Sequence, residues 1–155
     1  AHTRLPLWLF CRDVHRVIEL HRQRLAGIAS TATRARGGFC SFVASNNTSK
    51  DAGHRVKFVE QLSRSYKAVA CGGALLNNTP EGPVGDKLHF LEGYRFNVAF
   101  ENASREGYCT EKLLHAFAAE CVPIYWGDPL IASSNTRDGL LADFNPSAVI
   151  SAHDF

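Results

Sequence analysis

The sequence lacks several features that would assign a function class at once. Its 155 residues include no methionine, and the formal net charge is only +2. So small a net charge gives no reason to expect a nucleic-acid partner. Residues 5–11 are apolar, but this run is far shorter than the roughly 20 residues that a membrane-spanning helix needs. The absence of methionine indicates that the natural start lies outside this sequence. The sequence therefore gives no information about a leader or an anchor.

Motifs for metals and common nucleotide cofactors are also missing. The five cysteines include no C-x-x-C pair and the seven histidines have no metal-ligand spacing, so no metal site is expected. No G-x-G-x-x-G follows a predicted strand and no G-x-x-x-x-G-K-[ST] occurs, which removes the main support for a dinucleotide-dependent dehydrogenase or a P-loop enzyme. Cys40, Cys71 and Cys121 lie in apolar runs and are expected to be buried. Cys109 lies in a polar loop and is either a packed side chain or a reactive thiol.

What is present is the composition and the element pattern of one globular domain. The chain is 45% hydrophobic and 21% charged. Strands are predicted at residues 39–44, 67–71, 95–100, 122–126 and 148–151, and helices at 54–66, 85–93 and 110–120, the last with Thr110 as its N-cap. Short connections between alternating strands and helices imply right-handed βαβ units, so the predicted fold class is α/β, with a Rossmann-like parallel sheet flanked by helices.

The first 38 residues differ from the rest. Residues 13–25 predict a helix rich in Arg and His, and residues 30–38 read as a linker of small residues, two arginines and a glycine pair. The basic face of the helix is either solvated or directed at an anionic surface.

The loop at residues 101–112 is the first candidate for ligand binding, because parallel sheets bind ligands at the carboxyl ends of their strands. It joins a predicted buried strand to a helix start, where free N–H groups and the helix dipole attract phosphate. Lys112 lies in the first helical turn, where a cation opposes the dipole, so either an anionic ligand explains it or it is simply solvated. Glu111 could accept hydrogen bonds from ribose hydroxyls or could serve only as a favourable charge at the helix start.

Four further residues belong to the same edge of the predicted sheet. Arg55 lies in the first turn of the helix at 54–66, where its guanidinium could bind a diphosphate with two parallel hydrogen bonds, or remain a surface arginine. Tyr108 either stacks on a sugar ring or packs the loop. Glu101 and Asn102 end a buried strand, where polar side chains are costly unless they bond something, so they bind the ligand or brace the loop.

Two segments of the sequence resemble the central motif of the α-1,3/4-fucosyltransferases, glycosyltransferase family 10. They are YRFNVAFEN at residues 94–102 and GYCTEKL at residues 107–113. Further resemblances follow in the family's order at residues 39–46, 65–73, 122–127, 144–146 and 153–155. Agreement in order and spacing over about three quarters of the chain makes coincidence improbable.

The resemblance implies the C-terminal, donor-binding half of a GT-B-type glycosyltransferase. Residues 1–38 would be the end of the acceptor domain and a basic linker, and residues 39–155 the GDP-fucose-binding domain, truncated at its C-terminal end. Carried over residue by residue, the resemblance implies that Arg55 and Lys112 contact the diphosphate and that Glu111 binds the ribose. Tyr108 would lie against the nucleotide or fucose, and Glu101 and Asn102 would shape the donor pocket.

The implied reaction is the inverting transfer of L-fucose, in α-1,3 or α-1,4 linkage, to an N-acetylglucosamine-type or related acceptor on a glycoprotein, glycolipid or lipopolysaccharide. GDP-fucose would be a substrate, with no cofactor and no metal. The catalytic base is expected in the N-terminal domain, so this fragment alone is expected to be inactive. The family implies membrane association through other segments, at the lumenal side of the Golgi membrane in a eukaryote or the cytoplasmic face of the inner membrane in a bacterium. The alternatives are a catalytically silent sugar-nucleotide-binding fragment and a related transferase that uses another nucleotide sugar.

Overall fold

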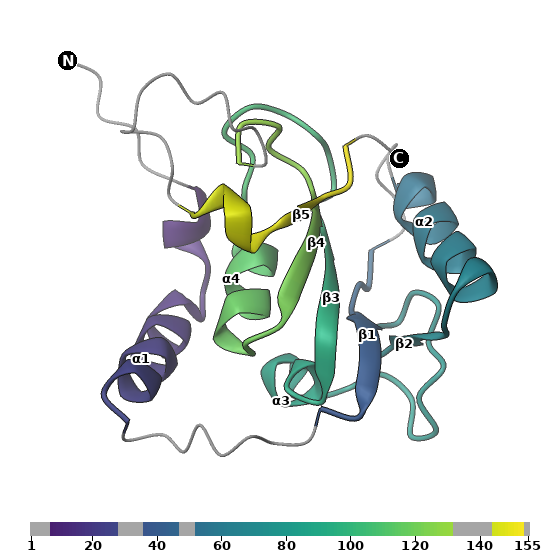
Figure 1. The fold of residues 1–155 in the computed structure, drawn as a ribbon, viewed down its shortest axis with the longest axis horizontal. Coiled ribbons are helices and arrows are strands. Elements are labelled where there is room, and N and C mark those ends of the chain that lie inside the picture. The colour runs from purple at the N-terminus through teal and green to yellow at the C-terminus, as the bar shows by residue number, and fades with distance from the viewer. Residues whose placement is uncertain (1–6, 28–35, 47–51, 132–143, 154–155) are drawn as a thin grey trace.

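A five-stranded parallel sheet forms the centre of the protein (Figure 1). The computed structural model describes residues 7–27, 36–46, 52–131 and 144–153. The strands are β1 (Gly38–Phe42), β2 (Val69–Cys71), β3 (Tyr94–Phe100), β4 (Val122–Trp126) and β5 (Ile150–Ser151). Their order in the sheet is β2-β1-β3-β4-β5. The predicted α/β fold class is therefore confirmed.

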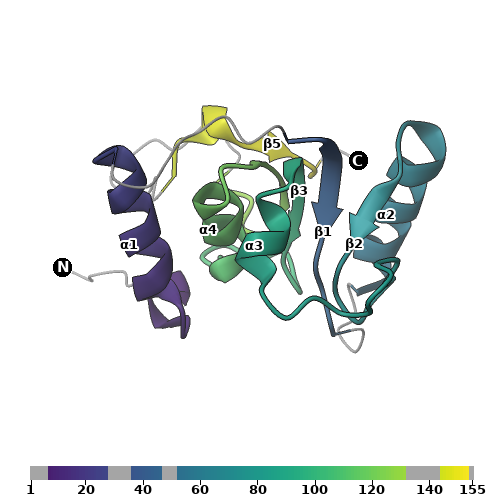
Figure 2. The same cartoon turned by 90° about the horizontal axis from the view of Figure 1, so that it is seen from below.

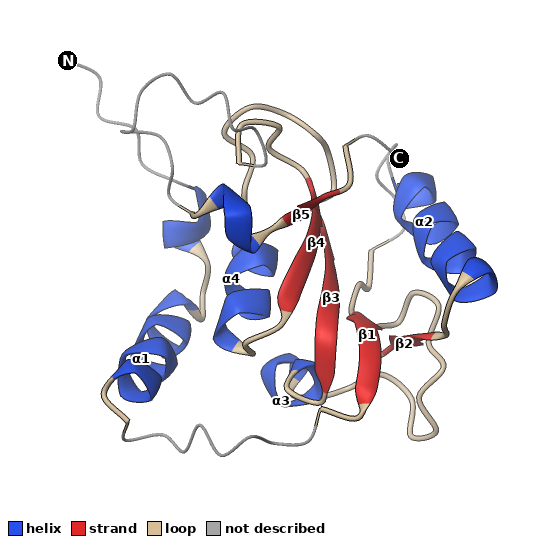
Figure 3. Cartoon of the chain, viewed as in Figure 1, coloured by secondary structure: helices blue, strands red, loops and turns tan. Residues whose placement is uncertain are grey.

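Helices cover both faces of this sheet. α2 (Ala52–Ser65) lies on one face, and α3 (Lys87–Leu91) and α4 (Glu111–Ala118) lie on the other (Figure 2). α1 (Val14–Leu25) lies outside α3 and α4 as a further layer. Two short 3-10 helices, η1 (Leu7–Phe10) and η2 (Pro146–Ala148), precede α1 and β5 (Figure 3). No helix in the described ranges is long and apolar enough to cross a membrane.

The core has one apolar cluster on each face of the sheet. On the side of α2, Phe42 and Phe100 are 1% exposed and pack with Phe58 of the helix. On the other side, Leu91 of α3 and Leu113 of α4 are fully buried. The sequence patterns that predicted strands with buried residues and amphipathic helices therefore correspond to a three-layer α/β core.

Side chains satisfy the backbone where β2 forms an edge of the sheet. The Asn78 side-chain oxygen accepts from the Cys71 N–H at 2.7 Å, and its amide donates to the Val69 carbonyl at 2.9 Å. The amide thus bonds the edge strand much as a neighbouring strand would. This arrangement leaves fewer open hydrogen-bonding groups at an edge that could pair with another chain.

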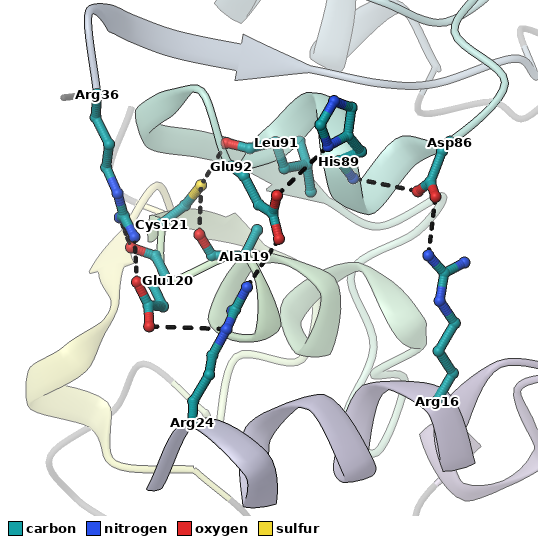
Figure 4. A network of polar contacts seen from close by, with 10 residues as sticks. All are labelled: Arg16, Arg24, Arg36, Asp86, His89, Leu91, Glu92, Ala119, Glu120 and Cys121. Atoms are coloured by element: carbon teal, nitrogen blue, oxygen red, sulfur yellow. Dashed lines mark hydrogen bonds and ion pairs between the residues drawn. The ribbon is translucent and has the colours of Figure 1, made fainter. Parts of the chain in front are cut away.

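α1 is attached to α3 and α4 by apolar packing and by ion pairs. Val17 packs with Leu88 and Ala118 in a small separate cluster. Around it, Arg24 pairs with Glu92 at 2.8 Å, and both side chains are less than a quarter exposed (Figure 4). The prediction that the basic face of this helix is either solvated or directed at an anionic surface is therefore incomplete, because part of that face binds carboxylates of the same chain.

Further polar contacts fix the same layer. Arg16 pairs with Asp86 at 2.8 Å near the start of α3, and Arg36 pairs with Glu120 after α4 (Figure 4). Directly before α1, the Asp13 carboxylate lies 2.6 Å from His115 Nε2. Burial, followed by the Lys87 charge, lowers the pKa of His115.

Most predicted elements shift by one to three residues. The predicted linker lies largely outside the described residues. Thr110 is the N-cap residue of α4, as predicted, but its hydroxyl donates to Glu101 and makes no side-chain cap bond. Cys109 is 1% exposed, which removes the accessibility that a reactive thiol needs, so it belongs with the buried Cys40, Cys71 and Cys121.

We expect Leu113→Ala to lower the free energy of unfolding by about 2–5 kcal/mol, because it removes a fully buried side chain between α4 and the sheet. Urea unfolding followed by circular dichroism would measure the change. A loss below about 1 kcal/mol would contradict the described packing, since only an exposed leucine is so easily truncated.

Candidate functional site

The candidate site lies between the carboxyl ends of β1 and β3. The strand order is the doubly wound order in which the chain leaves β1 toward one edge of the sheet and returns to build the other half from β3. Loops that leave neighbouring strands in opposite directions open a crevice at such a switch point. Asn46 follows β1, and Glu101 and Asn102 follow β3, so the sequence places polar groups at this point from both sides.

Arg55 reaches this point from the first turn of α2. The residue is only 1% exposed. Its Nη1 donates to Asn102 Oδ1 and its Nη2 to the Asn46 carbonyl, both at 2.7 Å, while its buried Nε has no partner. Burial lowers the pKa of the guanidinium, although Glu101 and Tyr108 oppose this effect. The alternative of a surface arginine is therefore wrong.

Glu101 organises the start of α4. Its carboxylate is completely buried. Oε1 accepts from the Thr110 N–H at 2.7 Å, and Oε2 accepts from the Thr110 hydroxyl at 2.6 Å and from Lys112 Nζ at 2.8 Å. Both oxygens are thus occupied within the protein. Of the two interpretations of Glu101, bracing the loop and holding Lys112 is the one that these contacts describe.

Lys112 lies among acidic side chains and is not simply solvated. Its side chain is 16% exposed, and Nζ lies 2.8 Å from Glu101 and 3.5 Å from Glu111. Burial alone would lower the pKa of Lys112, but these two carboxylates outweigh it and raise the pKa. The ammonium therefore stays charged and is held at the helix start, where an anionic ligand would meet it.

Glu111, the first residue of α4, is one-third exposed. Burial would raise the pKa of its carboxyl, but the charges of Lys112 and Lys87 outweigh burial and lower the pKa to about 2. Its second oxygen accepts from the Cys11 thiol at 3.8 Å. The favourable position at a helix N-terminus and the exposure of part of the carboxylate are compatible with both interpretations of this residue.

Tyr108 is half-buried in the loop between β3 and α4. Its N–H donates to the Arg105 carbonyl at 3.0 Å, which closes a tight turn. Its side chain contributes to the pKa shifts of both Arg55 and Lys112. The structure thus brings all six predicted site residues to one edge of the sheet, in an Arg55–Asn102 pair and a Glu101–Glu111–Lys112 group with Tyr108 near both cations.

Three residues near this site were not predicted from the sequence. Cys11 contacts Glu111 across 100 positions of sequence. Lys87, at the start of α3, lowers the pKa of Glu111, and the charge of Lys112 in turn lowers the pKa of Lys87. Asp128, in the turn after β4, is fully buried and accepts the Gly107 N–H at 2.9 Å. Only Asp128 had a sequence signal, because it follows a glycine at the carboxyl end of a predicted strand.

Comparison with known proteins identifies the family. The family profile described as "Glycosyltransferase family 10 (fucosyltransferase) C-term" matches residues 33–155. The chain belongs to this family. It is 36% identical over 149 residues to "Alpha-(1,3)-fucosyltransferase FucT" of Helicobacter pylori, an alignment that covers 96% of this chain and 28% of that protein. It is 44% identical over 104 residues to "GDP-fucose protein O-fucosyltransferase 3" of Xenopus laevis, with 62% of this chain and 21% of that protein covered.

Solved structures of α1,3-fucosyltransferases have a similar fold. An α1,3-fucosyltransferase crystallised with GDP-fucose superposes with a TM-score of 0.64 at 34% identity, covering 92% of this chain and 37% of that one. The structure of an α1,3-fucosyltransferase with GDP gives a TM-score of 0.64 at 35% identity, covering 91% and 36%. The parallel sheet with its flanking helices is therefore consistent with a GT-B-like glycosyltransferase fold. The chain spans 21–37% of the length of these relatives.

The depressed pKa of Glu111 makes stability depend on pH. Its pKa in the folded protein, about 2, lies below the ordinary value of 4.5, so the carboxylate stabilises the fold above pH 4.5 and this contribution is lost as the pH falls toward 2. Partial exposure keeps the effect small. We expect Glu111→Gln to flatten the fall in melting temperature over this range relative to the wild-type chain.

Thermal unfolding monitored by circular dichroism at several pH values would measure this difference. Glu81→Gln, on an exposed loop, is the control and should leave the wild-type pH dependence unchanged. Parallel curves for Glu111→Gln and wild type would show that Lys112 and Lys87 do not stabilise this carboxylate.

Proposed function

We propose that this chain is the donor-binding half of a fucosyltransferase and holds the diphosphate of GDP-fucose at the switch point between β1 and β3. One observation carries the proposal. Arg55 is a fully buried cation whose hydrogen-bond acceptors, among the described residues, are the uncharged oxygens of Asn102 and Asn46. A buried charge is costly unless an opposite charge compensates it. A diphosphate supplies two such charges and matches the geometry of a guanidinium.

Lys112 provides the second cation in this proposal. It stands in the first turn of α4, where backbone N–H groups and the helix dipole add to its attraction for phosphate. As the bond to fucose breaks, negative charge grows on the leaving GDP, and fixed cations in a site with little water stabilise that charge. We propose that Arg55 and Lys112 do this without a metal ion.

The remaining parts of the proposal follow from the family. Glu111 would bind the ribose and Tyr108 would lie against the nucleotide or fucose, with Asn102 orienting Arg55. The transfer would invert the configuration at the fucose carbon and form an α-1,3 or α-1,4 linkage to an N-acetylglucosamine-type glycan. The base that accepts the acceptor's proton would lie in the acceptor domain. Membrane association, in the Golgi or at the bacterial inner membrane, is part of the same proposal.

The strongest test separates binding from folding at Lys112. Lys112→Met alone would leave the buried Glu101 carboxylate without its cation, and this would lower stability. The double variant Lys112→Met/Glu101→Gln removes both charges and should recover most of that stability. We expect both variants to weaken GDP binding by about ten- to a hundredfold, because a charge-assisted contact contributes roughly 1.5–3 kcal/mol.

Titration calorimetry measures the affinity and thermal unfolding measures the stability. Lys57→Met, on the exposed side of α2, is the matched control, since it removes a lysine charge away from the site. If the stable double variant binds GDP as tightly as the wild-type chain, Lys112 has a structural role and does not belong to the proposed phosphate site.

A second prediction concerns the nucleotide. If the site is specific for a guanine-containing donor, the chain should bind GDP more tightly than UDP or CMP, because hydrogen bonds to the base discriminate where the diphosphate does not. Competition calorimetry with the three nucleotides would measure this. Equal affinity for GDP and UDP would leave a general diphosphate site and would favour the alternative of a transferase that uses another nucleotide sugar.

A further inference from the structure

The turn after β4 holds a buried carboxylate that is bonded to the loop between β3 and α4. Asp128 is completely buried. Its Oδ2 accepts the Gly107 N–H at 2.9 Å, and its Oδ1 accepts the Leu130 N–H at 3.0 Å. Gly107 belongs to the loop between β3 and α4 and directly precedes Tyr108. One side chain therefore connects the turn after β4 to the loop after the neighbouring strand.

The turn that carries Asp128 is itself firmly held. The Asp128 N–H donates to the Tyr125 hydroxyl at 2.9 Å, and Tyr125 is fully buried in β4. Cys109 packs in the same apolar cluster as Tyr125. The Ser104 hydroxyl donates to the Gly127 carbonyl at 2.8 Å. The loop from residue 104 to 109 is thus hydrogen-bonded to the turn after β4 at two points, Ser104 and Gly107.

Gly107 is the position in this loop where such a bond matters most. Its φ is +78°, a left-handed conformation that glycine adopts without a steric penalty but does not by itself prefer over many others. The bond from its N–H to Asp128 selects one orientation of the peptide plane. This N–H belongs to the peptide plane between Glu106 and Gly107, and the Tyr108 N–H, which donates to the Arg105 carbonyl at 3.0 Å, holds the next plane. Together the two bonds set the direction in which Tyr108 leaves the backbone. The Tyr108 side chain contributes to the pKa shifts of Arg55 and Lys112.

We propose that Asp128 is a positioning residue for nucleotide binding, which acts on the ligand only through Gly107 and Tyr108. The inference rests on the proposed function, because it assumes that Tyr108 contacts the bound nucleotide. Asp128 orders the loop before the ligand arrives, so binding does not have to supply that ordering, and affinity rises accordingly. The carboxylate suits this role because it accepts at both oxygens, whereas an asparagine can accept at only one.

The test is a double-mutant cycle on GDP affinity. Asp128→Asn keeps the shape of the side chain but loses one of its two backbone bonds, and we expect it to raise the GDP dissociation constant about tenfold. In a Tyr108→Ala background, Asp128→Asn should have little further effect, because the residue through which it acts is gone. Thermal unfolding of each variant records the separate effect on stability, which should persist in both backgrounds.

Asn78→Ala is the control for stability alone. Like Asp128, Asn78 makes two side-chain bonds to backbone, but it bonds the outer strand β2 and not the loop between β3 and α4. Its truncation should therefore lower the melting temperature and leave GDP affinity unchanged. Ser104→Ala gives a second test should Asp128→Asn fail to fold. It removes only the hydroxyl bond to Gly127 and should raise the dissociation constant about threefold.

The outcomes distinguish this inference from the function on which it rests. If wild-type protein binds GDP and Asp128→Asn binds it equally well, the positioning role is overturned and Asp128 is a structural residue. Effects of Asp128→Asn and Tyr108→Ala that simply add would also overturn it, as would an unchanged affinity in Ser104→Ala. If the wild-type chain binds no GDP, the proposed function falls, and this inference falls with it.

Discussion

The buried carboxylate of Glu101 is the group on which the candidate site depends. It directly follows β3, and its carboxylate binds three donors from the start of α4. A buried carboxylate needs such donors, because an ionised group without them is strongly destabilising. The sheet and the helix are thus fixed to each other by the requirement that one charge be satisfied. Lys112 acquires a defined position as a consequence.

The two cations of the site are held by different means. Lys112 is balanced by Glu101 and Glu111 within the protein, so it can be buried without a ligand. The described partners of Arg55 are neutral oxygens, so its charge is compensated less completely. An incoming anion therefore gains more from Arg55, while Lys112 adds a charge whose position hardly changes. Preorganised charges of this kind act on a ligand without the cost of rearrangement.

The sequence was sufficient for the fold class and for the edge of the sheet where the polar residues gather. Those inferences rest on periodicity and on the rule that loops after parallel strands share one edge, which are local properties. What could not be predicted depends on distant contacts. Nothing near Cys11 in sequence indicates that it meets Glu111, and nothing near Thr110 indicates that its hydroxyl would donate to Glu101 and not cap the helix. The Thr110 hydroxyl donates to Glu101, which lies nine residues earlier and directly follows β3.

The layer formed by α1 bears on where the chain can be divided. A boundary at residue 38, chosen because the sheet begins there, would remove Val17 from Leu88 and Ala118 and would strand Glu92 and Glu120 without their arginines. It would also remove Asp13 from His115, whose helix begins at the ligand edge. A shortened clone that starts at β1 would therefore expose a new apolar surface on α3 and α4. An expressed fragment of this protein should therefore start before η1, so that α1 is retained as part of the folding unit.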